Sequence, residues 1–244
     1  MNTQEKQPKL YSMGCMAFFF SGICAMSSGV IVSLLQEYYG FAYGMTGTLL
    51  SLMNIGNLVA GFASAILPSK IGTRATVMTL TSGYALGYLF MTTGNYMWLL
   101  MLAFLFLGLA KGNTINNCTV LVGNNAKDRT KGMNVMHASY ACGALLGPIL
   151  ITAALTMGKF TPMYALAVLG LVLWLVFVAG AGNMLNAASM GIMLPAAGLG
   201  AILMPWIIGM VAEGVSLQAG MFCNLVPCVG LLVFSLLCRR LGDE

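Results

Sequence analysis

Charge is the scarcest property of this sequence. Only 7% of its 244 residues are charged and 59% are hydrophobic, whereas an ordinary soluble domain carries about 25% charged residues. This composition excludes an ordinary soluble domain and is typical of a membrane protein. The net charge of +5 is explained below by membrane orientation, and it gives no reason to expect a nucleic-acid partner.

The groups used by most soluble enzymes are also missing. With one histidine, the chain cannot form a His-Glu-x-x-His metal helix, and it has no Gly-x-x-x-x-Gly-Lys-Ser/Thr loop for a nucleotide phosphate. The seven cysteines lie in apolar segments and form no Cys-x-x-Cys pair. The six acids, which fall in loops or tails and leave no buried carboxylate pair for catalysis, are Glu5, Glu37, Asp128, Glu213, Asp243 and Glu244. We therefore expect neither an enzyme nor a bound cofactor or metal.

Long apolar segments are abundant. A transmembrane helix needs about 20 apolar residues to cross about 30 Å of hydrocarbon. Eight segments meet this requirement: 10–36, 43–68, 75–93, 96–122, 133–155, 162–182, 187–212 and 219–238. The sequence predicts an all-α integral membrane protein with eight transmembrane helices.

Basic residues predict the orientation of these helices, because Lys and Arg in short loops stay on the cytoplasmic side. If eight spans alternate, Lys111 lies within a span and Lys159 lies outside. The other nine of the 11 basic residues fall on one side: Lys6, Lys9, Lys70, Arg74, Lys127, Arg129, Lys131, Arg239 and Arg240. We expect a multi-pass protein of a bacterial inner membrane with both termini in the cytoplasm.

Amide side chains interrupt two of the apolar segments. Asn54 and Asn57 are three residues apart, so they share one face of the second helix. Amides at this depth point toward a neighbouring helix or toward a polar path, and the sequence leaves both readings open.

The fourth helix carries Asn113, Asn116 and Asn117, which lie on the face away from Lys111. The two sets cannot both face one cavity. We favour the asparagine face as the one that lines a pore, and the Lys111 ammonium can extend toward the inner headgroups. The predicted substrate contacts are therefore Asn54, Asn57, Asn113, Asn116 and Asn117.

His137 begins the fifth helix and shares a stripe with Tyr140, Ala144 and Pro148. Histidine changes its charge near physiological pH, so a histidine within a span is a candidate for proton coupling. The alternative is a neutral, hydrogen-bonded residue at a helix interface.

A short internal repeat links the fifth and seventh helices. GALLGP at 143–148 and GAILMP at 200–205 share four of six residues. Secondary transporters are commonly built from internal repeats, so this weak repeat favours that class.

The loop after the second helix resembles a signature of the major facilitator superfamily, Gly-x-x-x-Asp-Arg-x-Gly-Arg-Arg. Ala65–Arg74 reads AILPSKIGTR, in which Lys70, Gly72 and Arg74 match the pattern. Ala65 replaces the first glycine and Ser69 replaces the acid, which in the family helps to lock one conformation. The resemblance implies that Lys70, Gly72 and Arg74 belong to an inner gate.

The fifth helix extends this resemblance. Gly143, Gly147 and Pro148 are similar to the family's Gly-x-x-x-Gly-Pro motif, and the resemblance implies a gating role for them. The asparagine-rich fourth helix, the Lys-Asp-Arg loop and the start of the fifth helix resemble the fucose-permease-like sugar symporter branch. That branch uses carboxylates in its first and fourth helices for proton coupling, and this sequence has none there.

The resemblance also predicts how the chain is divided. Residues 1–182 resemble a six-helix amino-terminal half, and residues 183–244 resemble the last two helices of the second half, so helices seven to ten are missing. The expected function is secondary active transport of a small polar solute, sugar-like and accompanied by a proton, across the lipid bilayer. A homodimer would complete the missing half. The alternative is a non-transporting membrane interaction protein or a decayed transporter fragment.

Overall fold

The computed structural model describes residues 8–93, 96–180 and 193–222, and these residues form helices and no strand. The helices are α1 (Pro8–Tyr39), α2 (Tyr43–Ile71), α3 (Thr73–Thr81), α4 (Gly83–Phe90), α5 (Met97–Asn125), α6 (Arg129–Leu155), α7 (Thr161–Gly180), α8 (Met193–Gly214) and α9 (Leu217–Phe222). The predicted all-α membrane fold is confirmed. Within the described ranges, α1, α2, α5 and α6 are long and apolar enough to cross a membrane, and Thr161–Phe177 of α7 is a shorter apolar helix.

Most predicted boundaries differ from the observed ones by a few residues, with two larger differences. The third predicted span, 75–93, is divided at Ser82 into α3 and α4. The last, 219–238, overlaps the described residues only at 219–222, in α9; the rest lies outside them.

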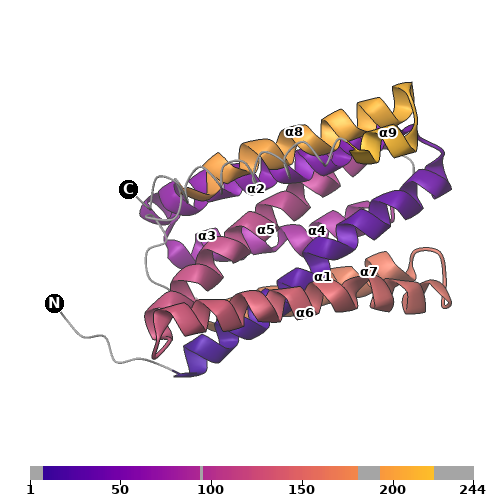
Figure 1. Ribbon diagram of the computed structural model, residues 1–244. Helices are drawn as coiled ribbons and strands as arrows, with labels where there is room; N and C mark the ends of the chain where they lie inside the picture. The colour runs from indigo at the N-terminus through magenta and orange to yellow at the C-terminus, as the bar shows by residue number, and fades with distance from the viewer. Residues whose placement is uncertain (1–7, 94–95, 181–192, 223–244) are drawn as a thin grey trace, which may run out of the picture.

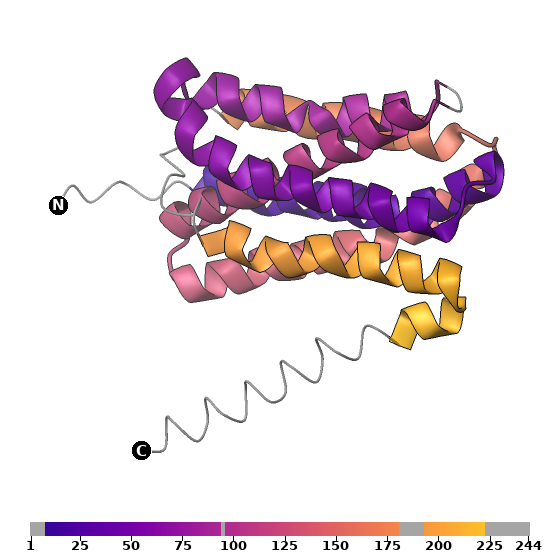
Figure 2. The same ribbon diagram turned by 90° about the horizontal axis from the view of Figure 1, so that it is seen from above.

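The helices are stacked side by side around α5. Figure 1 shows α2 and α8 along one edge, α6 and α7 along the opposite edge, and α5 between them. Helix α1 crosses obliquely from the α6 edge toward the α2 edge. Figure 2, the view from above, shows α8 and α6 on one side of the molecule and α3, α4 and α7 on the other.

Glycines bring the helix backbones into direct contact. A Cβ atom added at Gly56 of α2 would collide with the Leu105 carbonyl of α5, and one added at Gly108 would collide with the Met53 carbonyl of α2. Apolar side chains gain little by leaving lipid for a protein interface, so helices in membranes associate through close packing at small residues. The α2–α5 contact therefore depends on these two glycines.

The same arrangement joins α1 to α6 and α2 to α8. Gly143 of α6 lies against the Phe19 backbone of α1, and Gly22 of α1 lies against the Tyr140 carbonyl of α6. Between α2 and α8, Gly47 faces Gly209. The Ser51 hydroxyl adds a hydrogen bond of 2.7 Å to the Ile202 carbonyl.

A side chain from α7 marks the break between α3 and α4. The indole nitrogen of Trp174 donates a hydrogen bond of 2.9 Å to the Met78 carbonyl. The Met78 carbonyl also accepts from the Ser82 amide at 3.2 Å, so the indole adds a hydrogen bond at this position without displacing the one within the helix. Below the break, Gly83 and Gly87 hold α4 against α5.

Two buried tyrosines connect α4 to α1. The hydroxyl groups of Tyr84 and Ser21 are 2.8 Å apart, and the Tyr88 hydroxyl donates to the Cys24 carbonyl. Buried hydroxyl groups usually need such partners. These bonds fix the register of α1 relative to α4.

We predict opposite effects on stability for two glycine-to-alanine substitutions in helices. Gly108→Ala should lower the free energy of unfolding by about 1–3 kcal/mol, because the new methyl group meets backbone atoms that cannot move aside. Gly29→Ala in α1 meets no atom within 4 Å and should raise stability by about 0.5–1 kcal/mol, because alanine favours the helix. Thermal unfolding of detergent-purified protein measures both. Equal effects of the two changes would contradict the role of Gly108.

Candidate solute site

Three sides of α5 are covered by neighbouring helices. Gly108 and Gly112 face α2. Ala110 faces Gly83 of α4, and Val122 faces Gly14 of α1. Successive residues in a helix are about 100° apart, so Ile115 projects between Val122, which contacts α1, and Gly108, which contacts α2.

Lys111 lies about 20° from Val122 around the helix, on the side toward α1, and both Lys111 and Ile115 are half-buried. On α2, Asn54 lies between the residues that contact α5 and those that contact α8, and it is also half-buried. We call Lys111, Ile115 and Asn54 the central face. The Asn54 amide donates a hydrogen bond of 2.9 Å to Leu50 of its own helix, which leaves its carbonyl oxygen as an acceptor.

Asn113 and Asn117 form a buried network. The Asn113 amide nitrogen donates to Thr81 of α3 at 2.9 Å and to the Val77 carbonyl at 3.3 Å. Its side-chain oxygen accepts from Asn117 at 2.8 Å and from Ser64 of α2 at 3.4 Å. Asn113 therefore ties α5 to α2 and α3 in this conformation, and its predicted role as a solute contact remains a prediction.

Sequence reasoning did not identify Ser64 and Thr81 as partners of this network. Each is a small hydroxyl residue in an apolar helix and is buried. Hydroxyl groups in membrane helices commonly bond across helix interfaces. This tendency could have marked Ser64 and Thr81 as candidates. The spacing of residues along one helix, however, does not reveal which residue of another helix a side chain contacts.

Asn116 differs from Asn113 and Asn117 because its amide nitrogen has no hydrogen-bond partner among the described residues. It is 1% exposed, and its amide nitrogen makes no hydrogen bond with any residue that the structure describes. It lines a cavity of about 30 Å³ with Asn57, Gly61, Gly112 and Ile115. That volume suits one water molecule or one polar group of a ligand.

Gly112 creates the close approach at this cavity. A Cβ atom added there would lie 2.7 Å from the side-chain oxygen of Asn57. The structure thus brings two predicted site residues, Asn57 and Asn116, to the same cavity. Ile115 belongs to both the cavity lining and the central face, so the two features adjoin.

His137 is exposed on α6 and lies apart from the asparagines. Its ring packs edge-on against Phe18 of α1, with the centroids 5.6 Å apart. Tyr140, one turn further on, packs against the same ring at 4.8 Å. Within the described part of the chain no hydrogen bond of His137 is present, so the alternative of a hydrogen-bonded interface residue gains no support.

The predicted gating residues fall into two structural groups. Lys70 and Arg74 are exposed on either side of Gly72, which joins α2 to α3 with φ 84° and ψ 152°. Only glycine adopts this conformation readily. The Gly72 amide donates to Pro68, and its carbonyl accepts from Thr76.

In the second group, Gly143 and Gly147 face α1. Gly147 lies beside the Ser27 hydroxyl and the Ile23 carbonyl. Pro148 lies within α6 and is half-buried. These positions show a packing role for the two glycines, and gating by this motif remains a prediction.

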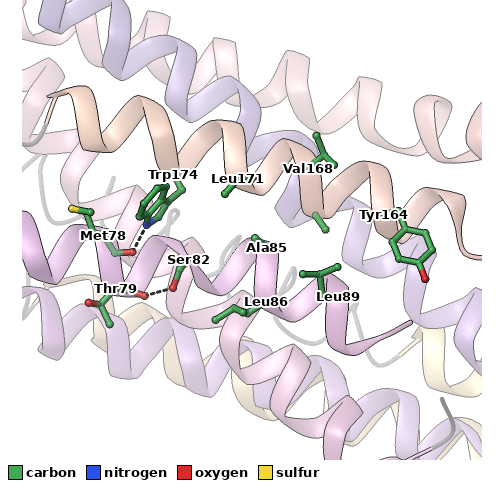
Figure 3. A pocket seen from close by; sticks show the side chains of 11 residues that line it. Met78, Thr79, Ser82, Ala85, Leu86, Leu89, Tyr164, Val168, Leu171 and Trp174 are labelled. Carbon is green, nitrogen blue, oxygen red and sulfur yellow. Dashed lines mark hydrogen bonds between the residues drawn. The ribbon is translucent and has the colours of Figure 1, made fainter. Parts of the chain in front are cut away.

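A larger cavity, of about 680 Å³, lies between α3, α4 and α7 (Figure 3). Its lining is largely apolar, with Leu86, Leu89 and Val168 among the side chains. Two of its polar groups already bond backbone carbonyls, Trp174 to Met78 and Ser82 to Thr79 at 2.7 Å. This groove is poorly suited to a polar solute.

Comparison with known proteins agrees with this architecture. The family model described as Major Facilitator Superfamily matches residues 14–182, which is more than half of the chain. No curated protein matches the sequence. The matched residues run from α1 to the end of α7 and include both the cavity and the central face.

We predict that two asparagine-to-leucine substitutions in α5 differ in their effect on stability. Asn113→Leu should lower the free energy of unfolding by about 1–3 kcal/mol, because it leaves buried partners unsatisfied. Asn116→Leu removes a buried amide nitrogen that has no partner among the described residues, so it should leave the free energy of unfolding unchanged or raise it by up to about 1–3 kcal/mol. Thermal unfolding in detergent compares them, and an equal loss for Asn116→Leu would show that its amide is already engaged.

Proposed function

Because the chain belongs to the major facilitator superfamily, we propose that it is a secondary active transporter that moves a small polar solute by alternating access. The observation that carries this proposal is the unpartnered, buried amide of Asn116 beside the Asn57 cavity. An unsatisfied buried donor costs about 1–3 kcal/mol. A solute oxygen that accepts a hydrogen bond from this amide would recover that energy on binding.

Solute binding would use the central face as well as the cavity. The Asn54 side chain keeps its oxygen available, and Asn57 lies at the cavity wall. Ile115 joins the two features. A solute with several hydroxyl groups fits amides that both donate and accept, which supports a sugar-like solute as the resemblance suggested.

Proton coupling would involve His137, which is exposed on α6 and so accessible to protons. Exposed Lys70 and Arg74 would form part of an inner gate, with Gly72 as the fixed turn between them. The Gly143–Gly147 contact with α1 would be the second moving interface. The distribution of basic residues supports a cytoplasmic position for Lys70 and Arg74, in a bacterial inner membrane.

The division of the chain supports a further part of this proposal. Residues 1–182 would form one transporter half, and 183–244 would be the last two helices of the other. Helix α8 packs on α2 through Gly47 and Gly209. In this proposal helices seven to ten of the family are missing, and a homodimer would supply the rest of the solute pathway.

The proposed function is tested by thermal unfolding and by uptake. A panel of sugars, polyols, amino acids and drugs is added to detergent-purified protein, and a ligand at 100 times its Kd should add about 2.7 kcal/mol to stability. Uptake of any stabilising compound is then measured in proteoliposomes. The Asn116→Leu substitution should reduce uptake at least tenfold, while the amount of the variant protein in the membrane equals that of the wild type.

The matched control is Leu86→Ala, which alters the apolar groove between α4 and α7 and should leave uptake unchanged. If no compound raises the unfolding temperature of well-folded protein, the proposed transport function is wrong. The chain is then a non-transporting membrane interaction protein or a decayed transporter fragment. If uptake survives Asn116→Leu, the site assignment is wrong although transport is real.

A further inference from the structure

Lys111 lies at the middle of a long apolar helix. It is 14 residues from both Met97 and Asn125, the ends of α5, which corresponds to about 21 Å in either direction. The side chain of lysine has only four carbons, so it cannot bridge that distance. The expected extension toward the inner headgroups is therefore not available to Lys111.

No acidic side chain neutralises this ammonium group within the described residues. Lys111 makes no hydrogen bond or ion pair with them. Asp128 caps the start of α6 by accepting from Thr130 and Lys131, and the Glu213 carboxylate accepts from the Gly44 amide at 2.9 Å. Glu37 lies near the outer end of α1, and the remaining acids, Glu5, Asp243 and Glu244, are in the terminal segments of the sequence.

Such a cation needs a counter-charge. Ionisable residues within membrane helices are costly, and they usually pair with one another or mark a substrate pathway. Lys111 is half-buried on the central face, so the described helices do not fully enclose its side chain. The missing negative charge can therefore come from the solute.

We propose that the transported solute is a small organic anion and that Lys111 pairs with its carboxylate. This inference rests on the proposed function and specifies its substrate class. A single ammonium is one point charge, which matches a monoanion. Gly112 and Ile115 line the Asn57–Asn116 cavity. Gly112 directly follows Lys111 in the sequence, and Ile115 lies one helical turn after it. Lys111 itself is not among the residues that line this cavity, so the inference assigns the carboxylate of the solute, and sugar acids paired with neutral sugars of similar shape are the probes that test it.

The test compares anionic and neutral probes of similar shape. Glucuronate, gluconate, lactate, glucose and glucose 6-phosphate are titrated against the full-length protein in detergent, and apparent Kd is obtained from the shift in unfolding temperature. We expect glucuronate or gluconate to bind at least tenfold more tightly than glucose. Tighter binding of glucose 6-phosphate than of the sugar acids would overturn the carboxylate assignment.

Variants of Lys111 identify the group that recognises the charge. Lys111→Met and Lys111→Gln should each raise the apparent Kd of the anion at least tenfold, whereas Lys111→Arg should retain most of the affinity. The matched control is Lys159→Met, because Lys159 lies over the Tyr38 ring at 4.2 Å outside the central face and should not alter anion binding.

The outcomes separate this inference from the proposed function. If glucose stabilises the wild-type protein as well as glucuronate does, and Lys111→Met leaves both unchanged, the protein binds a solute but the charge assignment fails. If none of these probes nor the wider panel changes the unfolding temperature, the proposed function fails and the inference fails with it.

Discussion

Close contact between helix backbones at glycine is the constraint on which this structure depends. Gly56 and Gly108 join α2 to α5, Gly143 joins α6 to α1, and Gly83 holds α4 on α5. Since lipid is as apolar as the helix surfaces, specificity must come from shape and from hydrogen bonds between helices. The glycines thereby set the rotation of α5, and this rotation decides which of its polar residues is enclosed and which remains accessible.

That rotation gives the polar residues of α5 different roles. Asn113 is enclosed, and its amide is fully used in joining α2, α3 and α5. Asn116 is enclosed but keeps an unused donor next to a small cavity. Lys111 lies on the same side of α5 as Val122 and stays half-buried. A hydrogen-bonded network, a polar cavity and a cation that has no partner among the described residues thus occur within two turns of one helix.

The sequence predicted much of the fold but less of the site. Lengths of apolar segments are a local property, so the helices were recognisable, and Gly72 was recognised because its motif requires a glycine turn. The break at Ser82 was not predicted, and the hydrogen bond beside it comes from Trp174, which is 96 positions from Met78 in the chain. Spacing correctly separated Lys111 from the asparagines. It could not show that Ser64 and Thr81 enclose Asn113, because these partners come from other helices.

The most direct test of the central claim asks whether the sector of α5 between α1 and α2 borders water. Single cysteines would be placed at Ile115 and, as a lipid-side reference, at Leu86 of α4, in protein whose native cysteines are replaced. Both would be treated with a membrane-impermeant thiol reagent in open membrane fragments. We predict that Ile115→Cys is labelled, that a bound solute slows this labelling, and that Leu86→Cys is not labelled. Equal protection of both positions would contradict a solute pathway along the central face.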